Sequence, residues 1–129
     1  MEARGENPPD PAFELAIDTL LNGDVEKLRG RLSRDPSLVH RRSAYGHRST
    51  LLHYVGSNGV ETYRQKVPLN LAEIARLLLE VGADVNGTAD MYGGGTTTLG
   101  LLVTSDHPAK AGVTDDVRKV LVAAGAKQD

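Results

Sequence analysis

Hydrophobic residues recur with helical spacing along this chain. After Pro11, apolar side chains fall at intervals of three and four residues, which places them on one helix face: Phe13, Ala16, Ile17, Leu20 and Leu21. Asn22-Gly23 interrupts this pattern, and Asp24 can cap a second helix that Pro36 ends. The pattern therefore predicts a pair of helices joined by a tight turn.

Two later stretches of the chain have nearly the same pattern. Residues 70–84 and 115–127 each predict an amphipathic helix that Gly-Ala ends, and residues 50–59 predict a shorter helix that ends at Asn58-Gly59. A unit that recurs and cannot bury its apolar face alone is typical of stacked repeats. The Thr, Leu and Val content of residues 96–104 favours a β-strand. Their register in the repeat favours a helix, and we expect the register to outweigh the local preference.

Specific motifs occur in the middle of the chain. Thr50-Leu51-Leu52-His53 is followed by Asn58-Gly59 and, downstream, by Glu73-Ile74-Ala75-Arg76-Leu77-Leu78-Leu79-Glu80-Val81-Gly82-Ala83-Asp84-Val85-Asn86. These motifs resemble the ankyrin repeat, and other stretches look like those of uncharacterised bacterial ankyrin proteins. The resemblance implies that Thr50 and His53 hydrogen-bond the helix start to its own and neighbouring turns. In the third unit Gly100 takes the place of His53.

The resemblance implies an all-α fold, an ankyrin-repeat solenoid of about three helix-turn-helix repeats with hairpin connectors. We expect an N-terminal tail at residues 1–10 and a single domain at 11–129, with repeats at about 11–42, 43–86 and 87–129. Repeats 2 and 3 carry long insertions between their two helices, one holding Tyr63 and Arg64, the other His107. In a stack these insertions should lie side by side, either as surface loops packed on each other or as a second binding surface opposite the hairpins.

Ankyrin proteins contact partners mainly through hairpin tips and the concave face. The resemblance therefore implies a partner-binding set: Tyr45, His47, Arg48, Ser57, Asn58, Asp90, Met91, Tyr92, Thr104 and Ser105. Tyrosine and arginine are frequent interface anchors; the alternative is that these tyrosines only shield the hairpins from solvent. We expect a non-catalytic scaffold for a protein partner. The alternative is a small-molecule-binding or enzymatic variant with a pocket walled by the inserted loops.

Motifs for catalysis or metal binding are weak. The glycines at 93–95 lack the lysine of a phosphate loop, and the four histidines show no i, i+4 pairing. Ser105-Asp106-His107 places three triad residue types in a row, but consecutive residues cannot face one another as a triad requires. We therefore expect no enzyme activity, no cofactor and no metal site.

Composition and charge narrow the class of partner. The chain has 129 residues, a net charge of -2, no cysteine and no apolar run of signal-peptide or membrane-spanning length, which favours a cytoplasmic domain without a membrane partner. The net charge argues against nucleic acid. Arginines are concentrated from Arg29 to Arg48, however, as either a solvated face or a patch for an acidic partner. Val122 and Ala123 on the last helix indicate weak self-association or a missing next repeat.

Overall fold

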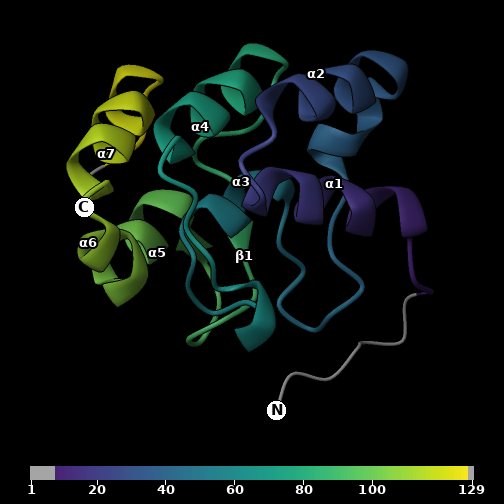
Figure 1. The fold of residues 1–129 in the computed structure, drawn as a ribbon. Helices are drawn as coiled ribbons and strands as arrows, with labels where there is room; N and C mark the ends of the chain where they lie inside the picture. The colour runs from purple at the N-terminus through teal and green to yellow at the C-terminus, as the bar shows by residue number, and fades with distance from the viewer. Residues whose placement is uncertain (1–7, 128–129) are drawn as a thin grey trace.

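The computed structural model describes residues 8–127 and is mostly helical, with one small two-stranded sheet (Figure 1). The elements are α1 (Pro11–Leu21), α2 (Val25–Arg34), η1 (Pro36–His40), α3 (Leu51–Val55), η2 (Thr62–Arg64), α4 (Leu71–Glu80), β1 (Thr88–Ala89), β2 (Thr96–Thr97), α5 (Thr98–Thr104), α6 (Asp106–Ala111) and α7 (Thr114–Ala123). Strands β1 and β2 pair antiparallel, with Thr88 opposite Thr97. The strand alternative for residues 96–104 therefore holds only for the first two residues.

Side-chain caps explain where the first two helices begin. The Asp10 carboxylate accepts the backbone N–H of Phe13 at 3.2 Å, and the Asp24 carboxylate accepts that of Lys27 at 3.1 Å. Each cap satisfies an N–H group that has no partner within the helix. Helix α2 ends just before Pro36, as the sequence predicts. The predicted apolar face of α1 is buried throughout.

Three helix pairs form a stack. Helix α1 packs on α2, α3 on α4, and α5 on α7. The first members of the pairs, α1, α3 and α5, contact one another in order, and so do α2, α4 and α7. Figure 1 shows these as two rows of helices, with α6 beside α5 and the hairpin of β1 below α3. The repeated sequence unit thus corresponds to a repeated structural pair.

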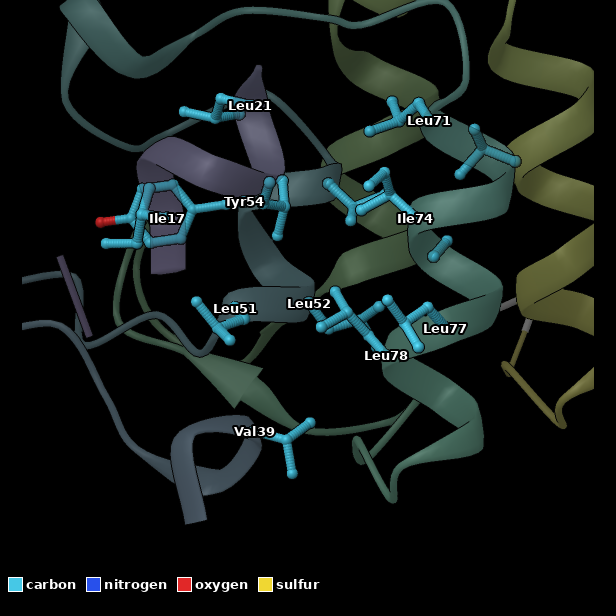
Figure 2. Close-up of a cluster of buried hydrophobic side chains, with 14 of the residues drawn as sticks. Ile17, Leu21, Val39, Leu51, Leu52, Tyr54, Leu71, Ile74, Leu77 and Leu78 are labelled. Carbon is cyan, nitrogen blue, oxygen red and sulfur yellow. The ribbon is translucent and has the colours of Figure 1, made fainter. Parts of the chain in front are cut away.

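The core lies between the two rows. Figure 2 shows Leu51 and Leu52 of α3 together with Leu77 and Leu78 of α4 in this layer, and all four side chains are buried. Burying a leucine stabilises a fold by about 1.5–3 kcal/mol. Helices α3 and α5 approach closely at Gly56, where a Cβ atom would lie 2.6 Å from Cβ of Leu101.

The predicted roles of Thr50 and His53 are confirmed by their hydrogen bonds. His53 is buried, its Nδ1 accepts the backbone N–H of Thr50 at 2.9 Å, and its Nε2 lies 2.8 Å from the carbonyl of Gly87 on the next hairpin. Burial lowers the pKa of His53, which favours the neutral ring that these contacts need. In α5 the Thr97 hydroxyl alone accepts the N–H of Gly100, at 3.2 Å.

The ends of the chain are only partly described. Residues 1–7 of the predicted tail lie outside the described residues, while residues 8–10 lead directly into α1. On α7 the Val122 side chain is half-buried and that of Ala123 is exposed. The prediction of weak self-association through these residues therefore stays a prediction.

Candidate functional site

The first insertion, residues 60–70, begins against the hairpin side of the stack. Its Glu61 side chain contacts His47 of the hairpin before α3, and the Tyr63 hydroxyl lies 3.3 Å from that of Tyr45 in the same hairpin. Arg64 reaches across to Asp18 of α1. The predicted position opposite the hairpins holds only for the end of the insertion, where the Asn70 amide donates to the carbonyl of Gly23 in the α1–α2 turn at 2.9 Å. The start of the insertion lies on the hairpin side, because Glu61 and Tyr63 have their partners there.

A buried polar network holds this insertion in place. The Glu61 carboxylate is 0% exposed and lies 2.5 Å from Nε2 of His47, 2.9 Å from the Tyr54 hydroxyl and 3.0 Å from Nη1 of Arg64. Burial alone would raise the pKa of Glu61, but hydrogen bonds from His47, from its own backbone, from Arg64 and from Tyr54 together lower it to about 2. Glu61 is therefore ionised throughout the neutral range.

Arg64 joins the insertion to α1. Its guanidinium is 5% exposed and lies 3.2 Å from Glu14, 3.0 Å from Asp18 and 3.0 Å from Glu61. Burial lowers the pKa of Arg64, but the hydrogen bonds to Asp18 and Glu61 outweigh this effect and raise it. A buried guanidinium with three carboxylate partners fixes the backbone around it, since removing the guanidinium would leave the buried Glu61 carboxylate with less compensating charge.

Aromatic rings are exposed on this side of the stack but are fixed by their hydroxyl groups. Tyr63 is 58% exposed and Tyr92 is 70% exposed. The Tyr92 hydroxyl donates to Oδ1 of Asn58 at 2.7 Å, and the hydrogen bond with Tyr45 raises the pKa of Tyr63 to about 12. Asn58 is itself held by a bond of 2.9 Å to the Thr104 hydroxyl. We call Tyr45, Asn58, Tyr63, Tyr92 and Thr104 the hairpin face.

Three non-glycine residues of this region adopt left-handed backbone conformations. Arg48 has φ of 52°, Ser57 of 53° and Tyr92 of 49°. This conformation costs an ordinary residue roughly 1–2 kcal/mol relative to glycine. Such outliers cluster at functional sites, where a particular side chain is needed despite the strain. Tyr92 is the clearest case, because it is bulky and directly precedes the glycines at 93–95.

The structure divides the predicted partner-binding set. Six members have exposed or half-buried side chains: Tyr45, Arg48, Asn58, Asp90, Tyr92 and Thr104. The prediction is wrong for the other four, whose side chains are buried within the scaffold: His47, Ser57, Met91 and Ser105. His47 is bound to Glu61, Ser57 accepts the Ser105 hydroxyl through its carbonyl at 2.8 Å, and Met91 packs against Gly59.

The predicted second surface is also divided. Tyr63 and His107 are exposed, whereas Arg64 is buried in the network. Nε2 of His107 lies 3.2 Å from Oε1 of Gln65, so the two insertions do lie side by side, as predicted. Tyr63 belongs to the hairpin face rather than to a separate surface.

An open hollow lies between α1 and the first insertion. Its volume is about 380 Å³, and its lining residues are Asp18, Leu21, Asn22, Tyr63, Arg64 and Lys66. The second insertion does not line this hollow, so it is not the pocket walled by both loops that the alternative function requires. A larger groove of about 700 Å³ lies between α4 and α7, in the row formed by α2, α4 and α7.

Two of the arginines between Arg29 and Arg48 form salt bridges within the fold. Arg29 lies 3.6 Å from Glu26 along α2, and Arg41 is paired with Asp10 and Asp35. The charges of the stretch are therefore partly compensated within the fold.

Residues 8–127 contain no group of three or more His, Asp or Glu side chains placed to hold a metal ion, and no helix in that range is long and apolar enough to cross a membrane. No protein-family model matches the chain, and no curated protein or solved structure is similar to it.

Proposed function

We propose that this protein is a non-catalytic scaffold of the ankyrin kind that binds a protein partner through its hairpin face. The ankyrin assignment is supported by the stacking of three helix pairs and by the hydrogen bonds of Thr50 and His53. The absence of cysteine fits work in a reducing compartment such as the cytoplasm.

The conformation and exposure of Tyr92 are the main support for this proposal. The residue is 70% exposed, its backbone is in a conformation that favours glycine, and its hydroxyl is fixed on Asn58. Packing within the chain does not account for an aromatic residue there, because most of its surface contacts solvent. A partner that covers the ring would account for it, since exposed aromatic rings are frequent anchors of protein interfaces.

Preorganisation explains how such a face binds. Tyr63 and Tyr92 each have a hydroxyl that is already hydrogen-bonded, so their rings lose little conformational freedom when a partner covers them. The buried network of Glu61 and Arg64 fixes the backbone that carries Tyr63. The partner then gains contact area from the rings without having to order the loops that present them.

The variant Tyr92→Gly tests this proposal. Glycine relieves the left-handed backbone, so the free energy of unfolding should change by no more than about 1 kcal/mol, as measured by urea denaturation. Partner affinity should fall about tenfold or more, as expected for an anchor residue. The partner is first captured with the wild-type protein from extract of cells that naturally express it, and its affinity is then measured by calorimetry with purified components.

The matched control is Leu15→Ala, which removes an exposed apolar side chain from α1, away from the hairpin face. It should leave the affinity unchanged. If Tyr92→Gly binds the captured partner as tightly as the wild type does, the hairpin face is not the binding surface.

A further inference from the structure

Two arginines beside the hairpin face have no acidic partner within residues 8–127. Nη1 of Arg42 donates to the carbonyls of Arg48 at 2.8 Å and Thr88 at 2.7 Å, and Nη1 of Arg48 donates to the carbonyl of Ser43 at 2.8 Å. Neither guanidinium forms a salt bridge within residues 8–127, whereas the neighbouring Arg41 forms two. Each guanidinium has five N–H groups, so both keep free donors and a full positive charge.

Both arginines border the same open hollow. It has a volume of about 420 Å³, and it is lined by Pro8, Pro9, Asp10, Pro11, Arg41, Arg42, Ala44 and Arg48. The lining contains three arginines and one carboxylate, that of Asp10, which Arg41 already binds at 3.3 Å. Asp90 of the next hairpin is exposed and forms no salt bridge within the described residues, but it does not line the hollow. The hollow itself therefore has an excess of positive charge.

The backbone of this region holds the guanidiniums in place. Arg42 joins two hairpins, because its two acceptors belong to Arg48 and Thr88. Arg48 adopts the left-handed conformation in which glycine would be less strained. A role of the arginine charge in binding would explain why arginine occupies this strained position. The bond to Ser43 already fixes where that charge lies.

We propose that Arg42 and Arg48 form a subsite that binds the carboxylate side chains of an acidic protein segment. This inference rests on the proposed function, because the subsite adjoins Tyr45 of the hairpin face. Guanidinium groups match the planar geometry of carboxylates and bind them with charge-assisted hydrogen bonds. A nucleic acid fits less well, because it needs positive charge along an extended path, and the neighbouring Arg41 is already neutralised.

The experiment uses the full chain and three probes: an oligoglutamate peptide, an oligoglutamine peptide of the same length, and a thymidine oligonucleotide of the same length. Binding is followed by NMR through the arginine Nε–H signals. Oligoglutamate should shift the signals of Arg42 and Arg48, more weakly as salt is added. The oligoglutamine should not shift them, and the oligonucleotide should bind more weakly than oligoglutamate.

Glutamine variants locate the binding. Arg42→Gln and Arg48→Gln remove the charge and keep a polar side chain, and each should weaken oligoglutamate binding about fivefold. The matched control is Arg34→Gln, since Arg34 also donates to a backbone carbonyl, that of Gly30, and lines a different hollow. It should bind like the wild type. Circular dichroism confirms folding, and either variant alone suffices if the other does not fold.

Three outcomes with these probes would overturn the inference. These are the absence of shifts with oligoglutamate, an equal loss of binding in Arg34→Gln, and tighter binding of the oligonucleotide. The proposed function fails separately: Tyr92→Gly would then keep full affinity for the protein partner. Conversely, arginine variants that bind that partner normally would remove the subsite and leave the role of Tyr92 intact.

Discussion

Replacing Glu61 with glutamine tests how strongly the buried network stabilises the fold. The variant keeps the shape of the side chain but removes the charge that His47, Tyr54 and Arg64 surround. The fall in the pKa of Glu61 from 4.5 to about 2 corresponds to about 3 kcal/mol of folding free energy. Removing one partner of a buried ion pair costs about 3–5 kcal/mol, and we expect the lower end because Arg64 keeps two other carboxylates.

The dependence on pH gives the sharper test. The pKa of Glu61 is lower in the folded state than in the unfolded chain, so its carboxylate contributes stability that is fully present above about pH 4.5. This contribution is lost as the pH falls toward 2. The difference in unfolding free energy between wild type and Glu61→Gln should therefore be constant near neutrality, shrink below pH 4.5 and nearly vanish at pH 2.

Urea denaturation followed by circular dichroism, repeated across this pH range, measures both quantities. The control is Glu73→Gln, because Glu73 is exposed on α4 and should contribute only about 0.5 kcal/mol through the helix dipole. A loss of less than about 1 kcal/mol at pH 7 for Glu61→Gln would refute the assigned strength of the network. A difference that stays constant down to pH 2.5 would refute the assigned pKa.

Two further predictions concern packing and the exposed tyrosines. Gly56→Ala should lower the free energy of unfolding by about 1–3 kcal/mol, because its Cβ would lie 2.6 Å from that of Leu101. Gly100→Ala should be neutral or stabilising by up to about 1 kcal/mol, because the nearest atom to its Cβ would be 3.4 Å away. Thermal unfolding compares the two, and equal effects would contradict the close approach of α3 and α5. In an absorbance titration Tyr63 should ionise at a pKa of about 12, and Tyr45→Phe should return it toward 10; an unchanged titration in that variant would contradict the hydroxyl pair.

The helices could be predicted from the sequence because local rules determine them. The apolar spacing after Pro11, the caps at Asp10 and Asp24 and the helix-ending Gly-Ala pairs all act within a few residues. Helix α6 was missed because it is short, and its cap Ser105 also bonds to the carbonyl of Ser57, far away in the sequence. A helix that depends on such a distant contact leaves little local signal.

The candidate site was predicted only in part, because burial there depends on the insertion. His47 belongs to a hairpin tip by sequence position, yet it is buried because Glu61 packs on it. Two signals for this network were present. Glu61 and Arg64 are opposite charges three residues apart, and Glu14 and Asp18 lie one helical turn apart on α1. Sequence alone does not pair them, since each set is also typical of a solvated surface.

The network has a further consequence for the hairpin face. Buried ion pairs often stabilise a fold no more than well-packed apolar side chains of the same size would. Stability alone is therefore a weak reason to place Glu61 and Arg64 in the interior. What their contacts determine is position: they fix the insertion against α1 and the first hairpin, so that Tyr63 meets Tyr45 at the surface. The insertion thus packs its charged side chains into the interior of the hairpin side. It leaves Tyr63 on the surface, where the proposed partner would contact it together with Tyr92.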